Sequence, residues 1–322
     1  MKTLLSRLTS IIVSALVVAS TVHAQAWPNR PIKFVVPFAA GGANDLMARA
    51  AAEGASKVLG QPVVIDNKPG AGSTLGAELV AKSAPDGYTF LISAAGVISN
   101  HMIKKSMPYK EADLVPVVMI ALAPSVIVAP PNSTYNNLRE FVEASKKEPG
   151  GFNFATAGTG STPHFVAEVL KTKYGANLQV VPYKSGNESA TAIMGGQVQA
   201  TSEASIVSLP KVKGGKMKAL AETWTKRISV YPELTTATEQ GFPEINIVHW
   251  AGVHAPSGVP TDVLDKLAAA VDAAMKMPDA ANRLKSSGIE PIGGTRAYFV
   301  QYVAEERARL AAIIKISGMK ED

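Results

Sequence analysis

The chain has 322 residues, of which 47% are hydrophobic and 18% charged, and it contains no cysteine. The lack of cysteine excludes a disulfide-stabilised scaffold, thiolate metal sites, thiol catalysis and the lipid anchor of a lipoprotein. The formal net charge is +6 and the basic residues are spread along the chain, so the composition does not favour a nucleic-acid-binding protein.

The first 24 residues have the pattern of a signal peptide. Lys2 and Arg7 lie beside an apolar stretch over residues 8–19. Two sites with the small residues that signal peptidase requires follow, one ending at Ala24 and one at Ala26. The stretch is much shorter than the ~20 apolar residues of a membrane-spanning helix. We therefore expect residues 1–24 to be removed on export to the periplasm, with cleavage after Ala24 preferred to cleavage after Ala26. Loss of Lys2 and Arg7 then takes the formal charge from +6 to +4.

Strand-like and helix-like segments alternate in the first half of the mature chain. A β-rich segment at 32–36 precedes apolar residues at helical spacing over 46–58, and residues 62–65 form the next strand. A Gly-rich loop leads to a helix that begins near Ser73, and a turn at 85–87 precedes a strand at 88–92. Strands separated by helices of this length predict right-handed βαβ units and a parallel sheet.

The same order of elements restarts after the two prolines at 130–131. A helix is expected at 138–144, a strand at 152–155, a helix at 165–174 and a strand at 178–181, and two amphipathic helices follow at 263–275 and 299–314. The apolar run 115–129 predicts two buried strands, one of which passes from one lobe to the other. Residues 245–255 are a second candidate for a segment that passes between the lobes. We therefore predict an α/β protein with two hinged lobes, lobe I over 25–124 and 250–322 and lobe II over 125–249.

Two Gly-rich loops of similar design, at 38–45 and 156–164, each join a strand to a helix. At a helix N-terminus the free backbone N–H groups and the positive end of the dipole favour an anion. Because the loops lie in different halves of the chain, we expect them to form opposite walls of one cleft. His164 is open to two interpretations, one in which it donates to a bound anion or orders the loop, and one in which it only caps local backbone.

Small polar side chains gather at the ends of the predicted strands and at the helix starts that follow. In open α/β sheets this edge binds ligands. Hydroxyl and backbone N–H groups can hold a carboxylate, since each hydrogen bond to an ionised group contributes roughly 1.5–3 kcal/mol. Such a site binds and releases a ligand but offers no acid, base or nucleophile. The hydroxyl residues concerned are Ser73, Thr74, Ser93, Thr156, Thr159, Ser161 and Thr162.

Two enzymatic alternatives are weaker. The motif GxGxxxG at 70–76 resembles a dinucleotide fingerprint, but the strand after it ends without the carboxylate that would hold a ribose. An exported α/β hydrolase would need a nucleophile, and Ser73, Ser93 and Ser161 all lie outside a GxSxG elbow. We therefore expect no enzyme and no cofactor.

A metal site is not expected either. The five histidines have no second histidine or carboxylate at ligand spacing. His249 and His254 are five residues apart on a predicted strand, and this spacing places them on opposite faces.

Seven short motifs, in this order, resemble those of the extracytoplasmic receptors of tripartite tricarboxylate transporters, the Bug receptor family. They are WPxRP at 27–31, VPFAAGGxxD at 36–45, NKPGAGS at 67–73, PDGYT at 85–89, AGTGSxxH at 157–164, GGQV at 195–198 and WxGVxAP at 250–256. The similarity covers essentially the whole mature sequence. It implies a monomeric, hinge-closing protein with a type II periplasmic-binding-protein-like fold, which captures a small carboxylate in the periplasm and delivers it to a membrane permease.

The resemblance also implies which residues contact the ligand. In lobe I the matching positions are Phe38, Ala40, Gly41, Gly42, Ser73 and Ser93, and in lobe II they are Thr156, Ala157, Thr159, Ser161 and His164. The chain departs from the family pattern at 185–190 and at 199–203, which are both expected to face the cleft. We therefore add Asn187 and Glu203 as residues that help to select the ligand.

The two opposed loops favour a dicarboxylate. Phe38 and Tyr183 are placed to flank a flat ring, so terephthalate is the first specific expectation. Aliphatic dicarboxylates, acidic amino acids and nicotinate-like monocarboxylates remain open.

Overall fold

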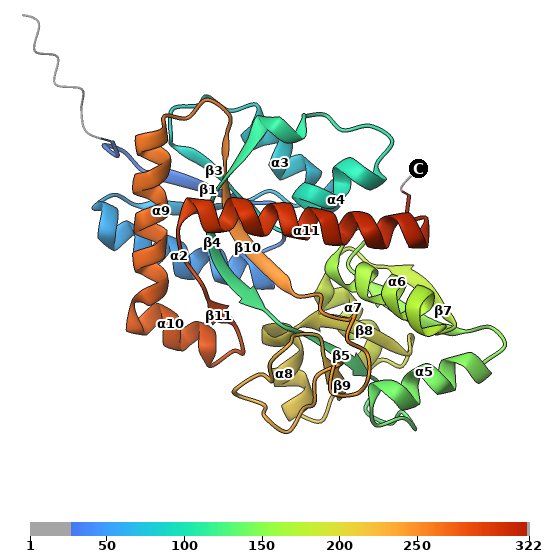
Figure 1. Cartoon of the computed structure of the whole chain (residues 1–322). Coiled ribbons are helices and arrows are strands. Elements are labelled where there is room, and N and C mark those ends of the chain that lie inside the picture. Colours follow the sequence, from blue (N-terminus) through green and yellow to red (C-terminus); the bar gives the residue numbers. More distant parts are fainter. Residues whose placement is uncertain (1–26, 321–322) are drawn as a thin grey trace, which may run out of the picture.

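The structure is a computed structural model and describes residues 27–320. The predicted signal peptide and both predicted cleavage positions, Ala24 and Ala26, lie outside the described residues. The described chain forms two α/β lobes, each built on its own sheet (Figure 1). Between residues 27 and 320, no helix is both long and apolar enough to cross a lipid bilayer.

Lobe I contains a six-stranded sheet. Its strands are β1 (Ile32–Val36), β2 (Val63–Asn67), β3 (Thr89–Ser93), β4 (Leu114–Ala123), β10 (His249–Pro256) and β11 (Glu290–Pro291). The order is β11-β4-β10-β3-β1-β2, in which β1 pairs in parallel with β2 and β3, and β10 is antiparallel to both of its neighbours. The carboxyl ends of β1, β2 and β3 therefore lie at the same edge of the sheet.

The helices of lobe I cover both faces of this sheet. They are α2 (Ala43–Leu59), α3 (Thr74–Ala81), α4 (Gly96–Ile103), α9 (Thr261–Lys276), α10 (Pro278–Lys285) and α11 (Arg296–Ser317), with 3-10 turns η1 (Ala71–Ser73) and η2 (Glu111–Asp113). Gly54 lets α2 and α9 approach closely, because a Cβ there would come within 2.5 Å of the Ala274 side chain. The C-terminus of α2 is closed by Gly60 in the left-handed conformation.

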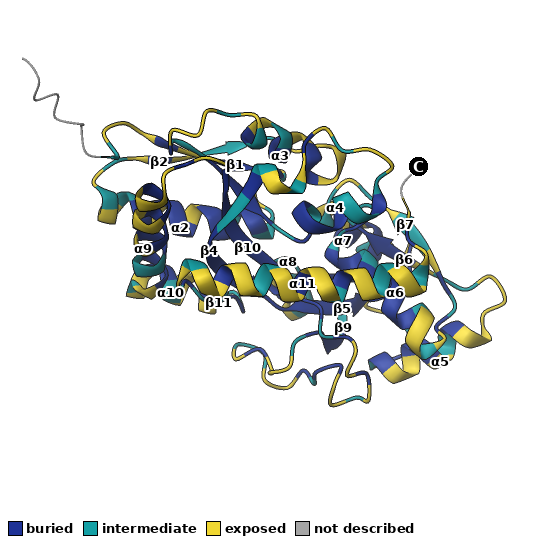
Figure 2. Cartoon of the chain, turned by 45° about the horizontal axis from the view of Figure 1, so that its top comes forward, coloured by how far each residue is buried: buried dark blue, intermediate teal, exposed yellow. Residues whose placement is uncertain are grey.

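Lobe II repeats the layout on a smaller scale. Its five strands are β5 (Ser125–Ala129), β6 (Phe152–Thr156), β7 (Leu178–Pro182), β8 (Ala200–Ala204) and β9 (Lys218–Glu222), in the order β7-β6-β8-β5-β9. The helices are α5 (Leu138–Lys147), α6 (Thr162–Tyr174), α7 (Gly186–Met194) and α8 (Ser205–Lys213). β6 is parallel to β7 and β8, so their carboxyl ends also share an edge. The strands of both sheets are mostly buried, and the helices expose their outer faces (Figure 2).

Two segments of the chain connect the sheets. The first is the junction at Pro124, where β4 of one sheet ends and β5 of the other begins. The second is the segment 223–248 between β9 and β10, and Thr223 donates a hydrogen bond from Oγ1 to the Ile247 carbonyl at 2.5 Å. The long helix α11 contacts α4 in lobe I and α6 in lobe II, so it lies across both lobes (Figure 1).

The fold class predicted from the sequence is confirmed: there are two α/β lobes with mainly parallel sheets. The apolar run 115–129 forms β4 and β5, as expected, and the predicted crossing near 245–255 forms β10. Helices α4, α7, α8 and α10 and the strands β8, β9 and β11 were not predicted as elements. The lobe boundaries at 124/125 and 249/250 stay a prediction.

Candidate ligand-binding site

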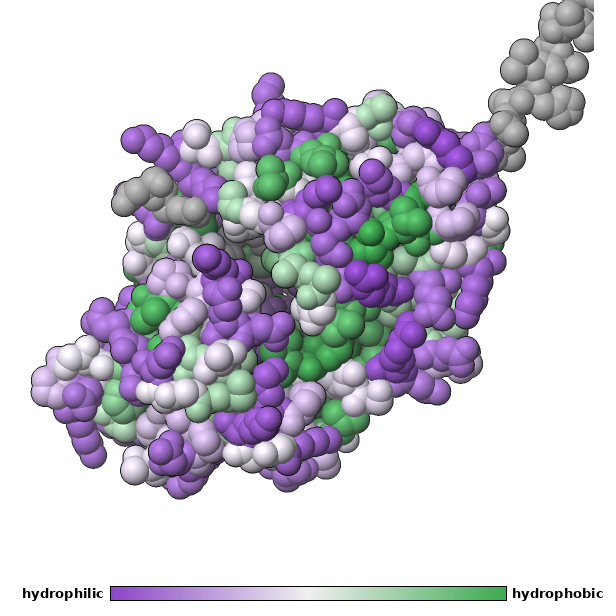
Figure 3. Space-filling view, turned by 180° about the vertical axis from the view of Figure 1, so that it is seen from behind, coloured by the Kyte–Doolittle hydropathy of each residue, from purple (hydrophilic) through white to green (hydrophobic). Residues whose placement is uncertain are grey.

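A cavity of about 640 Å³ lies between the lobes, at the carboxyl ends of the strands of both sheets. Seen from behind, the surface of the molecule is hollowed between its two parts (Figure 3). Of the residues expected from the sequence, those that line the cavity are Phe38, Ala40, Gly42, Ser73, Ala157, Thr159, Ser161, Asn187 and Glu203. Gly41, Ser93, Thr156 and His164 were also expected there, but they are not among its lining residues.

The wall from lobe I is the loop between β1 and α2, and its shape is set by Asp45. The carboxylate of Asp45 accepts hydrogen bonds from the Gly41 amide and from Arg49 Nε, both at 2.9 Å, and from Asn67 Nδ2 at 2.9 Å. Burial disfavours ionisation of Asp45, but these donors, Arg49 first among them, outweigh it and lower the pKa of the carboxyl group. Gly41 therefore supports the loop from behind, which explains why it does not line the cavity.

The N-terminus of α2 has no side-chain cap: its N-cap residue, Gly42, carries no side chain to accept a hydrogen bond. The first N–H groups of a helix have no partner within the helix, and the first two residues of α2, Ala43 and Asn44, line the cavity. Asn44, also a lining residue, donates from Nδ2 to the Trp250 carbonyl at 2.9 Å and so anchors this helix start to β10.

The wall from lobe II is the loop between β6 and α6, and His164 orders it. The Gly160 amide donates to His164 Nδ1 at 3.2 Å, and Ser161 donates from Oγ to the Gly158 carbonyl at 2.6 Å. Burial lowers the pKa of His164, so a neutral ring accepts the amide hydrogen bond. No side chain caps α6 at its N-cap residue, Ser161. Both walls thus present a helix N-terminus without a side-chain cap.

A third loop, before α3, has unusual backbone geometry. Ala71 and Ser73 adopt positive φ values of 47° and 76°, which is uncommon for residues with a side chain. Asn100 Nδ2 stabilises the loop by donating to the Gly72 carbonyl at 2.8 Å. Helix α4 of lobe I also meets the β6–α6 loop of lobe II, since Ser99 Oγ donates to the Gly160 carbonyl at 3.2 Å. The structure therefore holds the lobes in contact beside the cavity.

Ser93 and Thr156 are the last residues of β3 and β6, and both side chains point into the protein. Ser93 Oγ donates to the Gly252 carbonyl at 3.0 Å and lies 2.7 Å from His254 Nδ1. Thr156 is fully buried, and its hydroxyl has no hydrogen-bond partner within the described chain. A strand directs successive side chains to opposite faces, so the last residue of a strand does not always face the ligand edge.

The sequence pattern missed His249. This first residue of β10 lines the cavity, and its Nε2 is buried without a hydrogen-bond partner in the described chain. Burial lowers the pKa of His249 to about 4, so the ring is neutral at pH 7. The sequence placed His249 and His254 on opposite faces of a strand, which excluded a shared metal site but did not indicate which of the two faces a ligand.

The cavity wall is mainly uncharged. Lys184 and Glu203 are the only residues of charged type among its lining residues, and neither arginine nor aspartate occurs there. Over residues 27–320, no cluster of three or more histidine, aspartate or glutamate residues is arranged to hold a metal ion. The buried Ser93–His254 pair does not line the cavity, and burial lowers the pKa of His254 to about 3. The arrangement suits binding of a small polar ligand by backbone and hydroxyl groups.

Fold and site together define a two-lobed α/β binding protein with its ligand cavity in the cleft. Residues 47–319 match the model of the family described as "Tripartite tricarboxylate transporter family receptor", and the chain belongs to this family of solute receptors.

Three solved structures are similar to this chain over about nine tenths of its length. The periplasmic binding protein BugD is 32% identical, with a TM-score of 0.84 over 92% of this chain and 100% of that one. A protein of R. palustris solved with adipate is 31% identical, with a TM-score of 0.86 over 91% and 99% of the two chains. MatC from Rhodopseudomonas palustris, solved with bound malate, is 30% identical, with a TM-score of 0.83 over 89% and 100%.

Proposed function

We propose that this protein is a periplasmic receptor that captures a small dicarboxylate between its lobes and delivers it to the permease of a tripartite tricarboxylate-type transporter. One observation carries the proposal: the N-termini of α2 and α6, neither capped by a side chain, reach one cavity from opposite lobes. The start of α2 supplies several backbone donors, whereas the start of α6 supplies the Thr162 amide, because Pro163 has no N–H and the His164 amide donates to the Ser161 carbonyl at 2.9 Å. Each helix also presents a positive dipole end to one carboxylate. The adipate and malate in the related R. palustris structures are both dicarboxylates.

The proposed contacts follow from the lining of the cavity. Loop 38–42 and Ser73 would hold one carboxylate, and loop 157–161 would hold the other. Asn187 and Glu203 would contact the part of the ligand between them. Gly41 and His164 would act as positioning residues, because each is hydrogen-bonded within its own loop.

An aromatic dicarboxylate such as terephthalate remains the first specific ligand proposed. Phe38 and Tyr183 both line the cavity, from lobe I and lobe II respectively, and a flat ring could contact both. The accompanying proposals are a monomer, lobe boundaries near residues 124 and 249, export by the signal peptide and no catalytic activity.

A thermal-shift screen of mono-, di- and tricarboxylates and of amino acids tests the proposal. A ligand that binds only the folded protein stabilises it by RT ln(1 + [L]/Kd), which is about 2.7 kcal/mol at a hundredfold excess over Kd. We expect a dicarboxylate among the strongest stabilisers. A screen in which no carboxylate raises the melting temperature would contradict the receptor function. Turnover of a chromogenic ester that is lost in Ser161→Ala would instead support the hydrolase alternative.

A further inference from the structure

Two polar side chains lie on the floor of the cavity, where the chain passes from one sheet to the other. His249 pairs with Ala123 at the end of β4, and Glu203 pairs with Val126 at the start of β5. The two residues therefore pair with positions on either side of Pro124, where β4 leads directly into β5. Figure 1 shows β4 and β5 in the two sheets. Both side chains line the cavity.

The carboxyl group of Glu203 has little support from the protein. Glu203 is 4% exposed, and in the described chain no lysine, arginine or histidine nitrogen lies within ion-pair distance of its carboxyl oxygens. Thr201 Oγ1 is 3.4 Å from Oε1, but the same hydroxyl is 2.8 Å from the Ala155 carbonyl, to which it donates its single proton. The acceptor capacity of the Glu203 carboxyl group is thus almost unused by the protein.

Gly186 leaves the space that this carboxyl group occupies. A Cβ at Gly186, the first residue of α7, would lie 2.2 Å from Glu203 Oε2. The φ of Gly186 is not in the left-handed region, so the backbone itself would accept alanine there. The glycine therefore makes room for the carboxyl group, which is held against the start of α7 at the cavity wall.

The neutral ring of His249 adds a second unpartnered group, because its Nε2 is buried and has no partner in the described chain. The floor thus offers the carboxyl oxygens of Glu203 as acceptors and Nε2 of His249 as acceptor or donor according to its tautomer, whereas the loops offer N–H donors to carboxylates. Burial raises the pKa of Glu203 to about 8, and the charge of Lys211, which lies outside ion-pair distance, opposes this shift only in part. The carboxyl group is therefore largely protonated at pH 7 in the ligand-free protein, and a cation brought by a ligand would favour its ionised form. A ligand that brings a donor to this floor would satisfy both residues.

We propose that the ligand is a carboxylate that also carries a hydrogen-bond-donating substituent, either an ammonium or a hydroxyl group, and that this substituent binds Glu203 with His249 as its second partner. This inference rests on the proposed receptor function and narrows its substrate class: a terephthalate or an aliphatic dicarboxylate that carries such a substituent takes the place of unsubstituted terephthalate as the expected ligand. Glu203 is then the residue that separates such ligands from unsubstituted dicarboxylates. A ligand without a donor would leave the Glu203 carboxyl group buried and unpaired in the complex. Because an unpaired buried acceptor costs free energy, such a ligand should bind much more weakly.

Isothermal titration with matched ligand sets tests the inference. The sets are succinate with L-malate and L-aspartate, glutarate with L-glutamate, and terephthalate with 2-hydroxy- and 2-aminoterephthalate. In wild type we expect a donor-bearing ligand to bind at least tenfold more tightly than the unsubstituted member of its set. A preference for aspartate over malate identifies the donor as an ammonium group, and the reverse identifies a hydroxyl group.

Two variants locate the effect at Glu203. Glu203→Gln should reduce the preference for an ammonium-bearing ligand at least tenfold, because the amide carries no charge. Gly186→Ala keeps the carboxyl group of Glu203 but pushes it out of its position. This variant should therefore also reduce the preference. Two control variants should keep the wild-type preference. Ser202→Ala alters the neighbour of Glu203 in β8, and Gly195→Ala alters the other end of α7; neither residue lines the cavity.

The outcomes separate this inference from the proposed function. If unsubstituted dicarboxylates bind as tightly as their donor-bearing partners, the inference is wrong and the receptor function stands. The same holds if both Glu203→Gln and Gly186→Ala are folded, as judged by circular dichroism, and retain the wild-type preference. If no member of any set binds, the receptor function falls and the inference falls with it.

Discussion

Gly42 is a useful residue for testing the lobe I wall, because its backbone can accept a side chain. Its φ is −79°, and a Cβ there would contact nothing closer than the Ala39 carbonyl at 3.5 Å. A positive φ is one reason for glycine in loops of this kind. That reason holds for Gly41 and Gly160, with φ values of 80° and 74°, and it does not hold for Gly42. A substitution at Gly42 therefore tests access of the ligand to the helix N-terminus.

We predict that Gly42→Val weakens carboxylate binding at least tenfold without unfolding the protein. The branched side chain would stand between the ligand and the first N–H groups of α2, and the loss of one hydrogen bond to an ionised group costs roughly 1.5–3 kcal/mol. Titration calorimetry and circular dichroism measure the two effects. Gly150→Val is the matched control, since Gly150 has open space around it and does not line the cavity. Equal affinity of the two variants would show that the ligand does not use this helix start.

Glu203 should also make stability depend on pH. Burial raises the pKa of Glu203 in the folded protein to about 8 from its ordinary value of 4.5, so its stabilising contribution is complete below about pH 4.5 and is lost as the pH rises toward 8. Glu222, with a pKa raised to about 7, acts in the same direction. The buried His249 and His254 act in the opposite direction below pH 6.5, because their pKa values are lowered to about 4 and 3.

The window from pH 6.5 to 8.5 therefore isolates Glu203 from the histidines. We predict that the melting temperature of ligand-free wild type falls across this window and that Glu203→Gln flattens the fall. The variant should be the more stable protein at pH 8.5. Calorimetric melting curves at several pH values measure this, and parallel curves for the two proteins would show that Glu203 does not titrate in this range.

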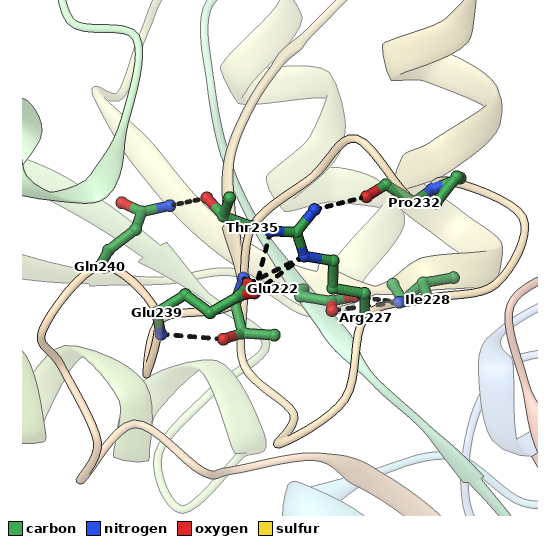
Figure 4. A network of polar contacts seen from close by, with 8 residues as sticks. Glu222, Arg227, Ile228, Pro232, Thr235, Glu239 and Gln240 are labelled. Carbon is green, nitrogen blue, oxygen red and sulfur yellow. Dashed lines mark hydrogen bonds and ion pairs between the residues drawn. The ribbon is translucent and has the colours of Figure 1, made fainter.

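At the scale of elements, the segment 223–248 is held to β9 by a polar network around Glu222 (Figure 4). Glu222 is fully buried, and its two carboxyl oxygens accept from the Ile228 amide at 3.1 and 2.8 Å. Arg227 donates to both oxygens of Glu239 at 3.0 Å and to the Pro232 carbonyl at 2.9 Å, but this ion pair is largely exposed. The buried group should therefore matter more to stability than the exposed pair.

We predict that Glu222→Ala lowers the free energy of unfolding by about 1–3 kcal/mol, because it leaves the Ile228 amide buried without a partner. Glu222→Gln keeps an acceptor oxygen and should cost less. Arg227→Ala should cost at most about 1 kcal/mol, as is usual for an exposed ion pair. Urea unfolding compares the three variants, and a larger loss for Arg227→Ala than for Glu222→Ala would reverse our ranking.

The sequence predicted those elements whose apolar pattern is strong, and it predicted the ligand edge from the glycines and hydroxyls that follow the strands. Helix α7 was not predicted, because its sequence is short and polar at its start, and β8 was not predicted because its polar residues at 201–203 are buried by tertiary contacts. Ser93 and Thr156 were placed at the ligand by their position in the chain, whereas the direction of a strand's last side chain depends on the neighbouring strand. His249 faces the cavity only because β10 pairs with the end of β4, which is a long-range contact.

At the scale of the whole molecule, binding requires that the two walls come together. Gly160 lies at the contact between the lobes, and a Cβ there would come within 2.6 Å of Ile103 and 3.1 Å of Ser99 Oγ. We predict that Gly160→Val keeps the lobes apart, weakens ligand binding at least tenfold and abolishes any ligand-induced decrease in the radius of gyration measured by small-angle scattering. Gly196→Val is the control, since Gly196 also has positive φ but nothing within 4 Å of its Cβ position. Unchanged affinity and compaction in Gly160→Val would show that this contact is not part of the bound state.

The most direct test of the central claim is a crystal structure of the protein with the carboxylate that gives the largest thermal shift. The account predicts one carboxylate within hydrogen-bond distance of the first N–H groups of α2 and the other end of the ligand at the start of α6. A ligand bound outside the cavity, or bound inside it with no carboxylate at either helix N-terminus, would contradict the account.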